Sequence, residues 1–166
     1  EPLLVQFIDF VSGNPDCCER HLQSGHLTGS AWLVSRDGQR ALLMHHRKLD
    51  RWLQPGGHTD GNADLAQVAL REAEEETGLT GLIIEPEIYD LDQHRIPARR
   101  GEPEHWHYDV RFVVRACGDE SFTQNEESLA LAWFDIQKLA DDGEFDESIG
   151  RMAQKWLGRF DKLNDH

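Results

Sequence analysis

The stretch at residues 56–79 constrains this chain most, because it joins a glycine turn, a polar loop and one acidic helix. In an α-helix, positions i, i+3 and i+4 lie on one face. Glu72, Glu75 and Glu76 therefore place three carboxylates on the same side of the helix. Clustered carboxylates repel each other, and a divalent cation that prefers hard oxygen ligands relieves this repulsion. The pattern predicts a metal site, and a plain solvated face is the alternative.

The same stretch resembles the Nudix box, which reads glycine, five residues, glutamate, seven residues, and then Arg-Glu-apolar-x-Glu-Glu-x-Gly-apolar. Gly57 takes the first position, and residues 71–79 (REAEEETGL) supply the second half at the family's spacing. The chain departs from the pattern at Ala63, which stands where the family has its first glutamate. The chain thus resembles the Nudix hydrolase family. This resemblance implies an α/β fold, the Nudix fold, which is an α/β/α sandwich with a mixed β-sheet.

The resemblance also implies metal-dependent hydrolysis of a diphosphate linkage in a nucleoside diphosphate derivative. Divalent ions, here Mg²⁺ or Mn²⁺, neutralise phosphate oxygens, position the attacking water and lower its pKa. By resemblance, Glu75 and Glu76 are direct metal ligands, and Glu72 is a third ligand or a base. The backbone oxygen of Gly56 is a further ligand. Arg71 belongs to the catalytic group because it orients the carboxylates by ion pairing.

The general base has to come from elsewhere, because Ala63 carries no carboxylate. Glu126 and Glu127, in the loop before residue 129, are candidates by position, and a plain solvent loop is the alternative. The loss at Ala63 also keeps a second function open. This alternative is a nucleotide-binding or sensor module on a Nudix fold, with weak or no catalysis.

A second constellation consists of histidines. His26 lies at the start of the first predicted strand, His58 follows the glycine pair, and His105 and His107 share one face of the strand at residues 105–115. A His-x-His pair on a strand can chelate zinc or manganese. The four histidines are therefore a candidate second metal site. Binding of a substrate phosphate by cationic histidines and a polar face without a ligand role are the alternatives.

The histidines also resemble the metal site of type I isopentenyl diphosphate isomerase, a Nudix-like fold in which histidines at the positions of His26 and His58 bind metal. That enzyme needs a cysteine at the position of Gly56 and a glutamate acid at the position of His107. Both proton-transfer groups are absent from this sequence. An isomerase-like enzyme is therefore the less favoured function.

Substrate contacts are expected beside the glycine turn and on the strand that follows the box. His58, Arg95 and Trp106 are the predicted substrate-binding residues, since basic groups can bind phosphate and an indole can stack on a base. Arg99 and Arg100 lie in the same predicted loop as Arg95. A solvated loop is the alternative for the arginines, and a core position is the alternative for the tryptophan.

The length, net charge and cysteine content of the chain limit which partners and which cellular compartment are expected. Its 166 residues suffice for a single Nudix hydrolase domain, residues 1–166, with a short N-terminal helical extension at about 1–24. The formal net charge of −14 argues against an extended nucleic-acid surface, and no apolar run approaches the roughly 20 residues of a membrane span. Cys17, Cys18 and Cys117 form no disulfide framework, which favours a reducing cytoplasm. The expected partner is a small phosphorylated substrate, and a homodimer is possible.

Periodicity and turn residues predict the order of the elements. Helices are expected at residues 3–11, at about 16–22, from Asp64 to Gly78, and from about residue 146 onward. Strands are expected at residues 25–35, 40–46, 82–84, 87–93, 105–115 and 129–134, with a loop at 95–104. This order fits a mixed sheet with helices on both faces.

Overall fold

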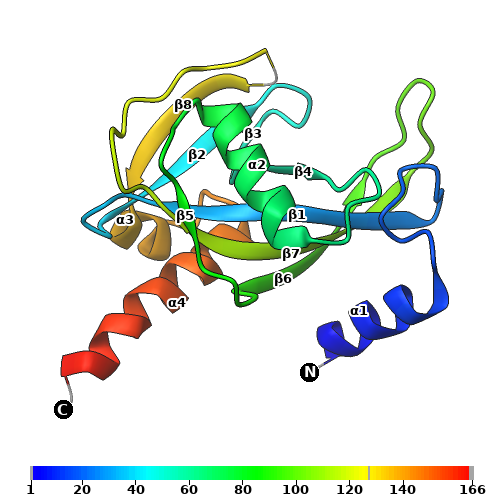
Figure 1. The fold of residues 1–166 in the computed structure, drawn as a ribbon, viewed down its shortest axis with the longest axis horizontal. Helices are drawn as coiled ribbons and strands as arrows, with labels where there is room; N and C mark the ends of the chain where they lie inside the picture. The colour runs from blue at the N-terminus through cyan, green and yellow to red at the C-terminus, as the bar shows by residue number, and fades with distance from the viewer. Residues whose placement is uncertain (1, 127, 165–166) are drawn as a thin grey trace.

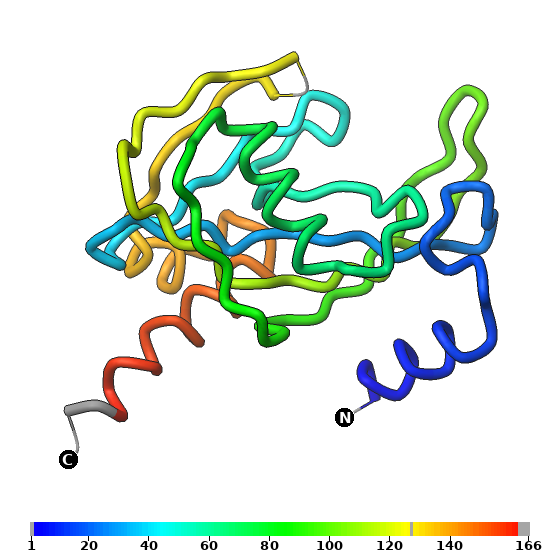
Figure 2. Tube along the Cα trace, in the orientation of Figure 1, coloured from blue at the N-terminus to red at the C-terminus, as the bar shows by residue number. Residues whose placement is uncertain are grey.

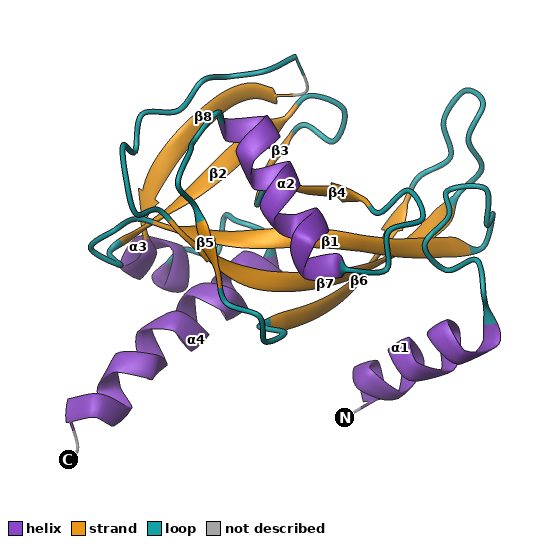
Figure 3. Cartoon of the chain, viewed as in Figure 1, coloured by secondary structure: helices purple, strands orange, loops and turns teal. Residues whose placement is uncertain are grey.

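The computed structural model describes residues 2–126 and 128–164, which form a sheet with helices on both sides (Figures 1 and 3). The helices are α1 (Pro2–Gly13), α2 (Leu65–Thr77), α3 (Ile136–Asp141) and α4 (Glu147–Asn164). The strands are β1 (Gly25–Val34), β2 (Arg40–His46), β3 (Arg51–Leu53), β4 (Gly56–His58), β5 (Ile83–Ile84), β6 (Asp90–Ile96), β7 (His105–Arg115) and β8 (Ser128–Asp135).

The sheet is mixed, and its centre is a long parallel pair. β1 and β7 run side by side from the Gly25/Trp106 pair to the Val34/Arg115 pair. The remaining strand pairs are antiparallel. The order of strands across the sheet is β3-β2-β1-β7-β5. In addition, β4 pairs with β1, β6 pairs with β7, and β8 pairs with β2. All residues of β1 are buried, as expected for a central strand that is covered on both faces.

α2 covers one face of the sheet (Figure 1). Its small residues Ala69 and Ala73 are fully buried, and they allow the helix to approach β1 closely. A β-carbon on Gly29 would lie 2.9 Å from the carbonyl oxygen of Leu65, so this crossing needs a glycine in the strand. The helix axis is therefore held at a fixed, short distance above the glycine turn in β4.

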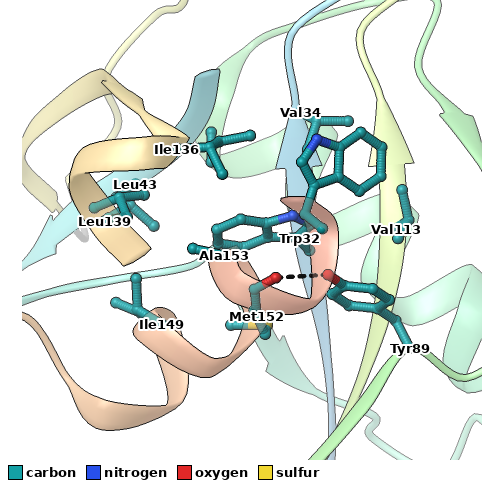
Figure 4. Packing of buried hydrophobic residues seen from close by; sticks show 12 residues of the cluster. Trp32, Val34, Leu43, Tyr89, Val113, Ile136, Leu139, Ile149, Met152 and Ala153 are labelled. Atoms are coloured by element: carbon teal, nitrogen blue, oxygen red, sulfur yellow. Dashed lines mark hydrogen bonds between the residues drawn. The ribbon is translucent and has the colours of Figure 1, made fainter. Parts of the chain in front are cut away.

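α3 and α4 cover the opposite face, where Trp32 of β1 packs among aliphatic side chains (Figure 4). The hydroxyl of Tyr89 donates a 2.6 Å hydrogen bond to the carbonyl oxygen of Met152 in α4. Ile149, Met152, Ala153 and Trp156 follow one another at helical spacing along α4 and are fully buried, whereas Phe160 near its end is 43% exposed. Helices on both faces of a mixed sheet confirm the α/β fold.

α1 adds a separate contact outside the two main layers. Phe10 stacks on Tyr108 of β7 with ring centroids 3.8 Å apart, and Phe7 meets the same ring edge-on at 5.4 Å. Both phenylalanines are buried.

Within the described part of the chain, no helix has the length and apolar character that crossing a bilayer requires.

The ends of α2 follow the local sequence signals. Asp64 caps the N-terminus by accepting a hydrogen bond from the backbone N–H of Gln67. Gly78 ends the helix in the left-handed conformation with φ 70°. Asn62 takes the place of a reciprocal bond from Gln67 to the cap, because its side chain donates to the Gln67 side chain and accepts from the Asp64 N–H.

Two element predictions were wrong. Residues 16–22 form turns instead of a helix, because the carbonyls of Cys17 and Cys18 accept hydrogen bonds from Leu27 and Gly61 and so cannot bond a next helical turn. The strand predicted at 87–93 starts and ends later, as β6, because its end pairs with the start of β7. The β6–β7 connection, drawn in light green, projects from the sheet as a long loop (Figure 2).

Candidate active site

A cavity of about 520 Å³ lies where the glycine turn, the acidic helix and the central strands meet. Its lining comes from β1, β4, α2, β6 and β7, together with the segment after β2. The box contributes five of the lining residues, namely Gly56, Gly57, His58, Glu72 and Glu76. The cavity therefore unites the two sequence features that predicted chemistry.

The three carboxylates of α2 differ in position. Glu72 and Glu76 line the cavity, whereas Glu75 is exposed and is not part of the lining. Glu76 is 3% exposed, and its Oε2 accepts a 3.1 Å hydrogen bond from the backbone N–H of Gly56. Two oxygen-rich groups on one rigid helix suit a hard divalent cation. The predicted ligand roles of Glu75 and of the Gly56 carbonyl remain predictions.

The glycine turn is shaped by close contacts on both of its faces. A β-carbon on Gly56 would lie 2.1 Å from the Oγ of Ser30 in β1. A β-carbon on Gly57 would lie 2.7 Å from the carboxyl carbon of Glu72. The backbone of the turn thus approaches β1 on one side and the helix carboxylate on the other, which only glycine permits.

Arg71 bridges the helix and the turn from outside the cavity. Its Nη2 lies 3.3 Å from the carbonyl oxygen of His58 and 3.4 Å from the Oε1 of Glu72. These contacts tie β4 to α2 next to the Glu72 carboxylate. The geometry agrees with an orienting role, and Arg71 is not among the lining residues.

A buried ionic network forms the floor of the cavity, and the sequence reasoning missed it. Asp109 of β7 accepts hydrogen bonds from Thr28 (2.8 Å), Ser30 (2.7 Å) and Gln54 (3.3 Å). Thr28 and Ser30 donate to its Oδ1, whereas Gln54 and the Nε of Arg111, at 2.8 Å, donate to its Oδ2. The sequence shows that Asp109 and Arg111 lie on one face of the strand predicted at residues 105–115. Nothing in the local sequence indicated their partners on β1.

Arg111 is 2% exposed and also contacts Asp90 (3.1 Å) and Asp92 (3.4 Å) of β6. Burial alone would lower the pKa of this guanidinium, but the facing carboxylates, Asp109 first, outweigh burial and raise it. Arg111 is therefore a permanent cation enclosed by acids, and it holds the cavity floor rigid.

The four predicted histidines do come together. His26 of β1 has ring centroids 4.9 Å from His58, 5.0 Å from His105 and 4.8 Å from His107. The strand register explains the cluster, since β1 pairs His26 with His107 and Thr28 with His58. One nitrogen from each of His26, His58 and His107 lies within 4.8 Å of the others.

Burial keeps three of these rings uncharged, namely His26, His58 and His107. Burial lowers the pKa of His26 and of His58 to about 4, and neighbouring cationic groups act in the same direction. Burial, followed by the nearby histidines, lowers the pKa of His107 to about 2. The three imidazoles are therefore neutral near pH 7, which preserves a nitrogen lone pair on each ring.

His94 of β6 joins the edge of the cluster, and no sequence pattern indicated it. Its ring centroid lies 5.4 Å from that of His107, and its Nδ1 lies 3.4 Å from the Oδ2 of Asp92. The predicted strand ended at residue 93, one position before His94. A correct register for β6 would have revealed that His94 faces His107.

Arg95 and Trp106 lie away from the cavity. The guanidinium of Arg95 covers the Trp106 ring at 5.0 Å, and it also meets Glu104 at 3.3 Å. Because side chains alternate along β7, placing His105 and His107 at the cavity turns Trp106 to the other face. Neither Arg95 nor Trp106 is a lining residue, and their substrate contacts stay predictions.

Cationic side chains also line the cavity. The lining includes Arg20, Arg47, Lys48 and Arg99. Glu126, a candidate base, also lines the cavity, and its carbonyl accepts a hydrogen bond from Arg47. The other candidate, Glu127, lies outside the described residues. Ala63 is exposed in the turn before α2 and is not in the lining.

Comparison with known proteins identifies the family. The NUDIX domain model matches residues 26–155. An RNA pyrophosphohydrolase of Sphingopyxis alaskensis is 30% identical over 127 residues, which cover 64% of this chain and 75% of that protein. The mouse protein nucleoside diphosphate-linked moiety X motif 6 is 28% identical over 153 residues, covering 84% of this chain but only 45% of its own length.

A solved structure supports the same assignment at the level of the fold. The binary complex of a C. elegans Ap4A hydrolase superposes with a TM-score of 0.64 at 17% identity, and the match covers 82% of this chain and 98% of that one. This likeness confirms the Nudix fold. The chain belongs to the NUDIX domain family, and its named relatives support the predicted Nudix-type pyrophosphohydrolase.

Proposed function

We propose that this protein hydrolyses a diphosphate linkage in a nucleoside diphosphate derivative and depends on Mg²⁺ or Mn²⁺. One observation carries the proposal: Glu72 and Glu76 line the same cavity as the box glycines and a group of cationic side chains. An acidic wall suits divalent ions, and a cationic rim suits phosphate groups. The names of the relatives, an RNA pyrophosphohydrolase and a nucleoside diphosphate-linked moiety X protein, support this substrate class.

The donor set fits a hard cation. Glu72 and Glu76 would hold the ion, with Glu75 and the Gly56 carbonyl as further candidates from the family pattern. When bound, the ion would neutralise phosphate oxygens and acidify the attacking water. The Gly56 N–H fixes one oxygen of Glu76, and Arg71 orients Glu72.

Positively charged groups would position the substrate. Arg47, Lys48 and Arg99 surround the cavity, and charged hydrogen bonds from such groups orient phosphates strongly. Arg99 is already fixed by a 2.9 Å hydrogen bond to the Lys48 carbonyl. Glu126 is the described candidate for the general base, since its side chain lines the same cavity. His58 remains a candidate substrate contact.

The second candidate function is a binding or sensor module with weak or no catalysis. The observation that favours it is the position of Ala63, which is exposed and supplies no carboxylate to the cavity. Tight nucleotide binding without product would support this function. A thermal-shift screen against nucleotides, followed by product analysis, separates it from hydrolysis.

The test is a substrate panel of nucleoside diphosphate derivatives, assayed with chelator, with Mg²⁺ and with Mn²⁺. We expect phosphate or nucleotide release that the chelator abolishes and added metal restores. Glu72→Gln and Glu76→Gln should remove turnover, and Glu74→Gln on the outward face of α2 is the matched control. An absence of turnover on every substrate, in protein shown to bind metal, would count against hydrolysis.

A further inference from the structure

The histidine cluster forms a built site of which the proposed hydrolysis uses only His58, as a candidate substrate contact. Three strands that are distant in sequence contribute to it, since His26 lies on β1, His58 on β4 and His107 on β7. Carboxylates explain a magnesium-type ion without any imidazole. A group of buried, unprotonated rings therefore needs its own explanation.

His26 gives the most direct evidence that a partner belongs in this cluster. Its side chain is 4% exposed, and neither ring nitrogen makes a hydrogen bond of normal geometry. The backbone of Leu22 approaches this ring closely enough to raise its pKa against the effect of burial, but not in the geometry of a hydrogen bond. Buried polar atoms are nearly always satisfied in folded proteins, so two orphaned nitrogens in one ring point to a missing ligand.

His105 shows the arrangement that commonly supports metal-binding histidines. Its Nδ1 lies 2.9 Å from the carbonyl oxygen of Pro103, which can only accept, so Nδ1 carries the hydrogen. In the neutral ring, Nε2 then has the lone pair, and it faces the Nε2 of His107 at 3.2 Å. This contact requires His107 to donate its Nε2–H, so the lone pair of the neutral His107 ring stands on Nδ1, which is the nitrogen that can bind a metal.

We propose that His26, His58 and His107 bind a transition-metal ion of the zinc class in the wall of the cavity. Their nitrogens already lie within 4.8 Å of one another, and imidazole is a preferred ligand of zinc. His105 lies beside the set and orients His107. The competing reading, capture of a phosphate by charged histidines, requires protonated rings, whereas burial keeps these three neutral.

The two metal sites would adjoin but differ in chemistry. His58 directly follows Gly57, over which the Glu72 carboxylate lies. Three histidine ligands leave one coordination position open for water or a substrate oxygen. Because His58 and His107 line the cavity, that position would be reached from the substrate side. The histidine site would therefore select a softer ion than the carboxylates of α2.

The experiment uses the tag-free full chain, stripped of metal by chelation and titrated with Co²⁺ in the presence of excess Mg²⁺. We expect one Co²⁺ per chain and a visible absorption band of nitrogen-ligated, low-coordinate cobalt. His26→Gln and His107→Gln should weaken Co²⁺ binding at least about tenfold. His21→Gln is the matched control, because this exposed histidine contacts Asp16 outside the cluster.

The outcomes separate this site from the proposed hydrolase. No Co²⁺ binding, or equal binding by wild type and His26→Gln, overturns the histidine site. A band that disappears in Glu72→Gln while surviving in His26→Gln also overturns it, because the ion would then sit on the carboxylates. A band that depends on the histidines supports the site even if the substrate panel yields no turnover.

A measurement on the wild type covers the case in which a variant does not fold. Long-range ¹H–¹⁵N correlation spectra report each imidazole separately. Zinc addition should shift the ring nitrogens of His26, His58 and His107 and leave those of His21 in place. If inorganic phosphate produces these shifts and zinc does not, the site binds anions and the proposal fails.

Discussion

The carboxyl carbon of Glu72 lies over the backbone of Gly57, where a β-carbon would come within 2.7 Å of it. Gly57→Ala should therefore displace this carboxylate without unfolding the protein. We expect turnover to fall roughly 10–100-fold, since small misplacements in a site cost that much. Steady-state kinetics at saturating Mg²⁺ measure the effect.

The control for this substitution is Gly158→Ala, since nothing lies within 4 Å of the new β-carbon at that helical position. It should keep activity and stabilise the protein slightly, by about 0.5–1 kcal/mol. Wild-type kinetics in Gly57→Ala would mean that the position of Glu72 does not matter for catalysis.

Burial distinguishes Glu76 from Glu75, so their substitutions should differ. Glu76→Gln keeps an oxygen that can accept the Gly56 N–H but loses the charge in the cavity. We expect a loss of roughly 10²-fold or more in kcat/KM, with a higher Mg²⁺ concentration needed for half-maximal rate. Glu75→Gln, on an exposed side chain, should show the smaller loss. The reverse order would place the ion on the exposed side of α2.

Arg111 should be essential for stability, because it is enclosed by three carboxylates and is 2% exposed. Arg111→Met keeps most of the volume and leaves those carboxylates without their cation. Breaking a buried ion pair in this way costs about 3–5 kcal/mol. Urea unfolding measures the loss. Arg100→Ala, on an exposed loop, should stay within about 0.5 kcal/mol of wild type, and an equal effect of both changes would contradict the network.

Asp92 should contribute to stability at the acid end of the pH range. Burial alone would raise the pKa of this carboxyl, but His94, Arg111 and Arg151 outweigh burial and hold its pKa below 3.8. A carboxyl whose pKa is lowered by folding stabilises the protein above its unfolded pKa, and that stability is lost as the pH falls through the folded value.

The free energy of unfolding should therefore decrease below about pH 4 less steeply in Asp92→Asn than in wild type. Urea unfolding at closely spaced pH values between 5 and 2.5 tests this difference in slope. Parallel curves for the two proteins would show that the Asp92 carboxyl gains nothing from its cationic neighbours.

Local chemistry made α2 and its ends predictable from sequence. Asp64 and Gly78 act on the backbone of the helix ends beside them, so an aspartate and a glycine at these positions favour helix ends in any fold. The helix at 16–22 failed for the opposite reason, since the hydrogen bonds that prevent it come from Leu27 and Gly61. Such partners become visible only when distant segments are brought together.

In the candidate site, too, the features set by local sequence were predictable, and those that depend on distant segments were not. Helical spacing placed Glu72, Glu75 and Glu76 on one side of α2, but it could not tell which of them enters the cavity. The strand alternation that grouped His105 with His107 was reliable because it depends on the pleat alone. The partners of Asp109 were out of reach, because Thr28 lies 81 residues away in sequence.

The parallel pairing of β1 with β7 has a consequence for how the protein acquires its site. Contacts this distant in sequence form late and slowly, because a long loop must close before they contribute. His26 and His107 meet only across that pairing. A cobalt or nucleotide signal during refolding would thus report completion of the central sheet, and a ligand that binds there would raise the Tm of the whole chain.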